Sequence, residues 1–167
     1  NVITNNNFGT AVSGEGLQNE GIHIDRQDGM IISGNEIQNL VSSTTTSQYG
    51  MRLLDFKNGQ CINNNIHDIL NTSTSTTPRL YGILVLSSSY NTVGNPSNAL
   101  IANNFVSKLN TSATSTTWNS SGICASTGYG DKYYYNSVHL TGQLNNSTSG
   151  LSAAFAHGDG TNTTPCN

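Results

Sequence analysis

Residues 21–37 read GIHIDRQDGMIISGNEI, and residues 50–66 read GMRLLDFKNGQCINNNI. Each stretch begins with a glycine and alternating apolar residues, continues through an Asp-Gly or Asn-Gly pair, and reaches an Asn 14 residues after its first glycine. Apolar residues at every second position are typical of β-strands, and the Asp-Gly and Asn-Gly pairs favour tight turns. Each stretch therefore predicts short strands separated by turns, with an Asn at a fixed place in the pattern.

The same two patterns alternate along the whole chain. The glycine pattern starts at five positions: Gly21, Gly50, Gly82, Gly122 and Gly150. The second pattern places an apolar residue three positions before an Asn and another two positions after it, and it is centred on Asn6, Asn35, Asn64, Asn103 and Asn136. The copy from Gly82 to Asn103 is seven residues longer than the others because of a polar, turn-rich stretch at 87–98. Self-similarity of this kind predicts a solenoid.

Each repeat predicts three short strands. The first begins at the glycine, the second leads to the Asn, and the third carries the next apolar pair. Strands stacked about 4.8 Å apart place equivalent residues in continuous inward columns. The repeated Asn side chains can hydrogen-bond to one another along such a stack, so we expect a structural ladder of Asn6, Asn35, Asn64, Asn103 and Asn136. The predicted fold is an all-β, single-stranded parallel β-helix of about five coils.

An asparagine ladder with three short strands per coil resembles the right-handed parallel β-helix of pectin and pectate lyases and their extracellular relatives. The resemblance covers residues 1–160 and concerns the architecture. It implies a right-handed coil and a binding cleft along the first strand of each coil, flanked by loops. We expect residues 1–167 to form one β-helix domain that belongs to a longer chain or assembly, because no initiator Met or signal peptide is present.

The composition narrows the possible partners and the compartment. The 167 residues carry a formal charge of -3, and only 9% of them are charged. Six Lys and Arg residues cannot form the basic face that nucleic acid requires, and no apolar run is long enough to span a membrane. Asn, Ser and Thr contribute 24, 21 and 20 residues. This polar, weakly charged composition indicates an extracellular or cell-surface protein.

Four Ser/Thr/Asn-rich segments separate the third strand of one coil from the next glycine. They are residues 41–48, 71–79, 110–121 and 142–149. We expect them to project from one edge, where they either form a binding face or serve as solvated or glycosylated decoration. Tyr49 and Tyr81 directly precede successive glycines, and Trp118 lies in the next long loop at the same edge. These three rings are the predicted glycan-binding residues, with a role in covering the core as the alternative.

A catalytic alternative follows from the resemblance. A lyase of this fold needs acidic calcium ligands and an Arg or Lys base, and a hydrolase needs two carboxylates about 5–10 Å apart. The candidates are His23, Asp25, Arg52 and Asp55. The competing interpretation is structural, since residues with equal offsets from the glycine stack on adjacent coils. It predicts the cross-strand ion pairs Arg26–Asp55 and Asp28–Lys57.

The three cysteines do not predict a disulfide or a metal site. Cys61 falls in an inward column with Ile32 and Leu100, whereas Cys124 falls at an outward position. Neither 1–9 nor 161–167 resembles a capping helix, so we expect either further coils or end-to-end stacking of copies into a filament.

The leading functional prediction is a non-catalytic stalk, adhesin or fibre-forming segment. Its expected partners are glycans or other surface proteins, and an end-to-end homo-oligomer is possible. It requires no cofactor. The alternative is a polysaccharide lyase or glycoside hydrolase, for which calcium is the expected cofactor.

Overall fold

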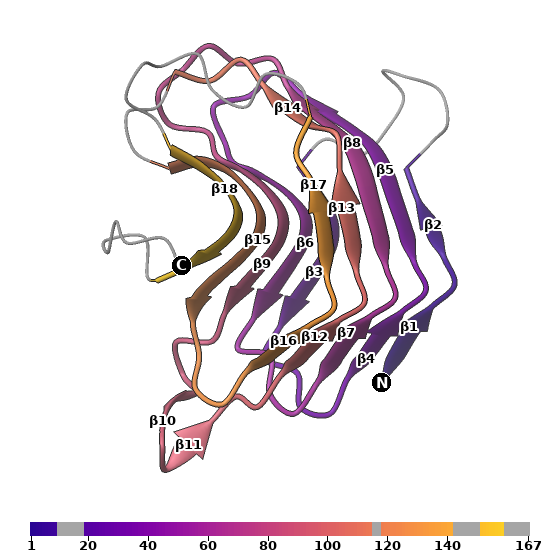
Figure 1. The fold of residues 1–167 in the computed structure, drawn as a ribbon, viewed down its shortest axis with the longest axis vertical. Helices are drawn as coiled ribbons and strands as arrows, with labels where there is room; N and C mark the ends of the chain where they lie inside the picture. Colours follow the sequence, from indigo (N-terminus) through magenta and orange to yellow (C-terminus); the bar gives the residue numbers. More distant parts are fainter. Residues whose placement is uncertain (10–18, 115–117, 142–150, 159–167) are drawn as a thin grey trace.

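The computed structural model describes residues 1–9, 19–114, 118–141 and 151–158, with the side chains of Trp118, Asn119 and Leu151 excepted. The chain forms an all-β solenoid of about four turns, in which parallel strands stack into three sheets (Figure 1). The predicted all-β parallel β-helix is confirmed, with about four turns where the sequence predicted about five coils. The residues described contain no helix with the length and hydropathy needed to cross a membrane.

Successive turns contribute strands to the same three sheets, as the three-strand repeat predicts. Sheet C holds the strands that contain the repeated glycine: β3 (Glu20–Asp25), β6 (Gln48–Leu54), β9 (Leu80–Leu86), β15 (Trp118–Thr127) and β18 (Leu151–His157). Sheet A holds β1 (Val2–Thr4), β4 (Ile31–Ser33), β7 (Gln60–Ile62), β12 (Leu100–Ala102) and β16 (Lys132–Tyr134). Sheet B holds β2 (Asn7–Phe8), β5 (Glu36–Ser42), β8 (Asn65–Asn71), β13 (Phe105–Ser107), β14 (Leu109–Thr111) and β17 (Ser137–His139).

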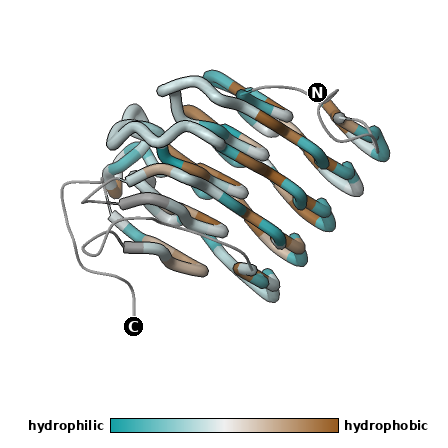
Figure 2. Tube along the Cα trace, turned by 90° about the horizontal axis from the view of Figure 1, so that it is seen from above, coloured by the Kyte–Doolittle hydropathy of each residue, from teal (hydrophilic) through white to brown (hydrophobic). Residues whose placement is uncertain are grey.

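The core consists of stacked aliphatic columns. In sheet C, Ile22 is in register with Met51, which is in register with Ile83. In sheet A, Ile32, Cys61 and Ile101 are in register, and each of these side chains is fully buried. Figure 2 shows the same arrangement along the chain, because the hydrophobic stretches of successive coils lie beside one another. Strands this short are stabilised by burial between coils, since one coil alone cannot enclose a core.

A ladder of asparagine hydrogen bonds runs along the corner between sheets A and B. Asn6 donates to Asn35 Oδ1 at 3.1 Å, and Asn35 donates to Asn64 Oδ1 at 2.9 Å. The next two rungs are Asn104 and Asn136, with Nδ2–Oδ1 distances of 2.9 Å from Asn64 to Asn104 and 3.0 Å from Asn104 to Asn136. Asn103 was therefore the wrong residue for the fourth rung.

Coil four is shifted by one residue from the pattern inferred from sequence. Ile101, rather than Leu100, is in register with Cys61, and Val106 is buried while Phe105 is 43% exposed. Asn103 occupies the corner before the rung with φ = 54°, which matches φ = 57° at Asn63. Asn is one of the few residues that adopt this left-handed conformation readily. Asn103 therefore forms the left-handed corner, and the adjacent Asn104 forms the rung of the ladder.

The repeated glycines of sheet C are required by close packing. A Cβ at Gly21, Gly50, Gly82 or Gly122 would lie 2.5–2.7 Å from a carbonyl oxygen of the next coil. It would also collide with an Ile or Val side chain of sheet B. The position after Gly122 in this column is Ala154, because Ser121 pairs with Ala153 and Ile123 with Phe155. Gly150 was therefore wrongly assigned to the column.

The stretch 87–98 folds as an insertion. It contains a small antiparallel hairpin of β10 (Asn91–Thr92) and β11 (Asn95–Pro96), which projects from the solenoid at the corner between sheets C and A (Figure 1).

Candidate functional site

A groove of about 400 Å³ runs over the outer face of sheet C. It spans several coils, so that residues far apart in sequence contribute to one surface. The described lining residues are Ser47, Tyr49, Arg52, Thr77, Arg79, Tyr81, Leu84, Leu86, Ser121, Cys124, Ser126, Ala156, His157 and Gly158. None of them is an Asp or Glu.

The groove follows from the glycine column. Without Cβ atoms at these positions, sheet C approaches sheet B closely. The strands of sheet C are curved (Figure 1), and the groove lies along their outer side. The loops between sheets B and C form one wall, to which Ser47 and Thr77 belong. These loops bond to one another, because Thr77 Oγ1 donates to the Thr45 carbonyl at 3.1 Å. The predicted placement of loops beside the first strand is therefore confirmed for these two loops.

Tyr49 and Tyr81 stack on each other along the solenoid axis. Their ring centroids lie 5.4 Å apart with an interplanar angle of 7°. The guanidinium of Arg52 lies 5.0 Å from the centroid of Tyr49, which is within the range of a cation–π contact. Tyr81 is only 7% exposed. The two rings therefore present mainly edges and hydroxyl groups to the groove, rather than open faces.

Arg79 precedes β9 and is held by its backbone. Its amide donates to Ser47 Oγ at 3.1 Å, and its carbonyl accepts from the Gln48 amide at 2.9 Å. The side chain donates a hydrogen bond to Tyr81. Burial raises the pKa of Tyr81, and this hydrogen bond from Arg79 opposes the effect. Tyr81 therefore stays neutral and acts as an acceptor for the guanidinium.

Glu20 joins two of the predicted catalytic residues and is a residue that the sequence reasoning missed. Its Oε2 lies 2.8 Å from His23 Nδ1, and its Oε1 lies 3.0 Å from Arg52 Nη1. Its position in the repeat could have revealed it, because Glu20 directly precedes Gly21 as Tyr49 directly precedes Gly50. The structure places Glu20 and Tyr49 in register. Because Glu20 neutralises Arg52, this arginine is partly committed to a structural contact.

The two candidate carboxylates lie outside the groove lining. Asp25 is half-exposed and pairs with its neighbour Arg26, with an Nε–Oδ1 distance of 3.5 Å. Asp55 accepts hydrogen bonds from the Ser89 amide at 2.8 Å and the Ser89 hydroxyl at 2.6 Å. Asp55 thus anchors the start of the insertion, and the predicted Arg26–Asp55 ion pair is wrong.

The Asp28–Lys57 ion pair is also replaced by other contacts, although the two backbones do form a parallel bridge. Asp28 accepts from Asn58 Nδ2 at 2.9 Å. Lys57 Nζ instead reaches the insertion, 3.4 Å from Asn95 Oδ1 and 5.0 Å from the centroid of the Tyr90 ring. The contacts of Lys57 depend on side chains of the insertion, which the repeat pattern does not include.

The remaining predicted positions are the ring of Trp118, the loop 142–149 and the cysteines. The backbone of Trp118 starts β15, but its side chain lies outside the described part of the structure, as does the loop 142–149. Cys124 lies in the groove in register with Leu84, and burial raises its pKa to about 11. Burial raises the pKa of the core residue Cys61 to about 12. Both described cysteines are free.

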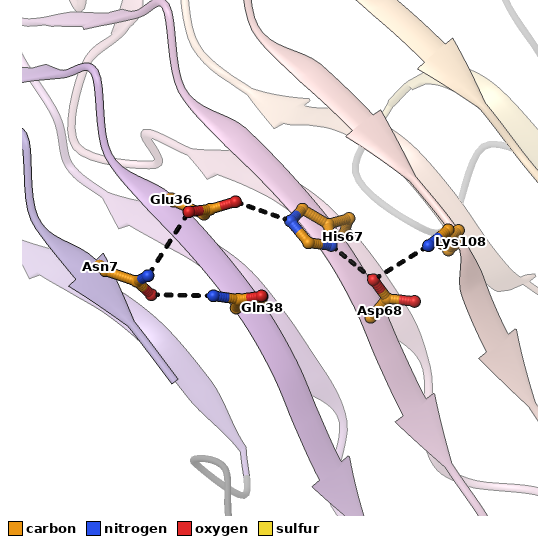
Figure 3. A network of polar contacts seen from close by, with 6 residues as sticks. All are labelled: Asn7, Glu36, Gln38, His67, Asp68 and Lys108. Carbon is orange, nitrogen blue, oxygen red and sulfur yellow. Dashed lines mark hydrogen bonds and ion pairs between the residues drawn. The ribbon is translucent and has the colours of Figure 1, made fainter. Parts of the chain in front are cut away.

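A second polar cluster lies on the outer face of sheet B (Figure 3). Both ring nitrogens of His67 contact carboxylates, with Nε2 3.1 Å from Glu36 Oε1 and Nδ1 against Asp68. Lys108 Nζ lies 3.3 Å from Asp68 Oδ2. Burial would raise the pKa of Asp68, but hydrogen bonds and charge from His67 and Lys108 outweigh it and lower the pKa. The cluster connects successive coils and supports their register.

Neither the groove nor this cluster offers a metal site in the described ranges, where no group of three or more His, Cys, Asp or Glu residues is arranged to hold an ion. No protein-family model matches the chain, and no characterised protein or solved structure matches it. The parallel stacking of the three sheets defines the class of the protein as a parallel β-solenoid.

Proposed function

We propose that this chain is a non-catalytic, extracellular or cell-surface β-solenoid segment that binds glycans along the groove of sheet C. The observation that carries the proposal is the lining of the groove. Hydroxyl groups, tyrosine edges and guanidinium groups surround an apolar floor, and the described lining has no carboxylate.

This chemistry suits a sugar chain. Sugars present many hydroxyl groups together with apolar C–H faces, and both need partners in a binding site. Ser47, Thr77 and Ser126 provide hydroxyl groups, whereas Leu84 and Leu86 provide apolar surface. The groove runs across several coils, which suits an extended oligosaccharide better than a compact ligand.

The alternative is a lyase or hydrolase resembling the right-handed pectate lyases. Its support is the position of Arg52 in the groove. The proposal of binding without catalysis is favoured because Asp25 and Asp55 pair elsewhere and do not line the groove. An assay for eliminated or hydrolysed products, with and without calcium, separates the two functions. Activity that Arg52→Ala abolishes would favour the enzyme.

The direct test is to block the groove at its rim. Thr77→Trp places a large side chain at an exposed lining position, and Thr74→Trp places the same side chain at an exposed position of the same loop outside the lining. Binding is measured on a glycan array and then by calorimetry. We expect Thr77→Trp to weaken binding and Thr74→Trp to leave it unchanged. Equal binding by all three proteins would refute the groove as the binding site.

A further inference from the structure

Arg79 differs from the other two arginines of the chain in its charge environment. Arg26 has the Asp25 carboxylate at 3.5 Å, and Arg52 has the Glu20 carboxylate at 3.0 Å. In the described part of the chain, Arg79 forms no ion pair, and its recorded side-chain partner is the neutral Tyr81 hydroxyl. Among the described residues, the guanidinium therefore has no carboxylate that compensates its charge.

The position of Arg79 directs this charge to the groove. Two backbone hydrogen bonds to the preceding coil hold the residue where the loop meets β9, and the side chain lines the groove beside Tyr81. A guanidinium has five N–H donors in a planar fork, so the bond to Tyr81 leaves donors for a ligand. An uncompensated arginine in a partly dehydrated groove is a recognition group for a planar or tetrahedral anion.

The remainder of the groove limits the ligand to few charges. Arg52, the second arginine, is neutralised by Glu20, which uses both of its oxygens on Arg52 and His23. Among the described lining residues, His157 is the one further basic side chain, and Leu84 and Leu86 form apolar surface near the arginines. One fixed charge beside apolar and hydroxyl groups does not match a polyanion, for which a row of cations would be needed.

We infer that the groove selects glycans that carry a single anionic substituent, and that Arg79 binds this substituent. This inference rests on the proposed glycan-binding function and narrows its ligand class. The anion is a carboxylate or a sulfate ester on an otherwise neutral oligosaccharide. The neutral sugar rings lie along the hydroxyl-rich wall and the apolar floor.

The experiment compares matched oligosaccharides by calorimetry. The pairs are sialyllactose and lactose, a glucuronate-terminated oligosaccharide and its glucose-terminated counterpart, and a singly sulfated galactoside and its unsulfated form. The carboxylate and sulfate pairs distinguish the two sources of the anion. The variants are Arg79→Gln, Arg79→Lys and the control Arg26→Gln, which removes the same charge at an exposed site outside the groove.

We expect the anionic member of at least one pair to bind about tenfold or more tightly than its neutral partner, since charge-assisted hydrogen bonds are the stronger class. Arg79→Gln should remove this preference, Arg79→Lys should retain part of it, and Arg26→Gln should retain all of it. Circular dichroism checks that each variant is folded. Equal binding of charged and neutral partners by the wild type, or a preference that survives in Arg79→Gln, overturns the inference while glycan binding stands. Failure of every oligosaccharide to bind refutes the proposed function itself.

Discussion

Replacing Asn104 should damage the solenoid far more than replacing its neighbour Asn103. Asn104 is 1% exposed, and its Nδ2 donates to the Cys61 carbonyl at 2.9 Å. Its Oδ1 accepts from the Asn64 amide at 3.0 Å. Asn104→Ala therefore leaves a buried carbonyl and a buried amide without these partners. Each such orphaned group costs about 1–3 kcal/mol, so the free energy of unfolding should fall by about 2–6 kcal/mol.

Asn103→Ala is the matched control. Asn103 is exposed and has φ = 54°, so the substitution loses the tolerance of Asn for a left-handed corner and no buried hydrogen bond. The expected cost is about 1 kcal/mol. Urea unfolding followed by circular dichroism and extrapolated linearly to water measures both values. If Asn103→Ala cost as much as Asn104→Ala, the register of coil four described above would be wrong.

Three further predictions concern other parts of the structure. Gly82→Ala should lower stability by about 1–3 kcal/mol, because overpacking a close contact is costly, whereas Gly94→Ala should be nearly neutral in a thermal melt since its Cβ would meet no atom within 4 Å. Tyr135→Asn should raise stability by about 1 kcal/mol in urea unfolding, because Tyr135 is 86% exposed and has φ = 52°; a loss would mean that its ring contacts outweigh the strain. The lowered pKa of Asp68 means that its stabilisation is present above the unfolded-state pKa of about 3.9 and is lost as the pH falls through the lower folded value. Asp68→Asn should thus lower the Tm at neutral pH and cause a smaller loss below about pH 4, and a constant gap across this range would contradict that role.

The architecture could be predicted because its signals are local. A period of two in the apolar residues, glycines at one offset and Asn at another describe each coil within one repeat, which is 29 residues long from Gly21 to Gly50, and stacking repeats the description. The columns through Ile22, Met51 and Ile83 follow directly from this spacing. The close approach that requires Gly82 is equally encoded, since no residue with a Cβ fits there.

The candidate site could be predicted only in outline. Its location along the first strand, the stacking of Tyr49 on Tyr81 and the position of two loops agree with the pattern. The pairing of charges does not, because an ion pair depends on side-chain reach and on competing partners. Ser89, which donates hydrogen bonds to Asp55, belongs to an insertion that has no counterpart in the repeat.

The amino-acid sequence by itself therefore determined a parallel β-solenoid, its three strands per turn, its corners and the order of its inward columns. Tertiary structure alone decided which of two adjacent Asn residues forms the fourth rung, that Ala154 rather than Gly150 continues the glycine column, and that Arg79 is the arginine without a described carboxylate partner. The physical reason is the same in each case. A local pattern specifies which residue types are acceptable at a position, whereas register and charge pairing are set by which neighbouring coil the side chain meets.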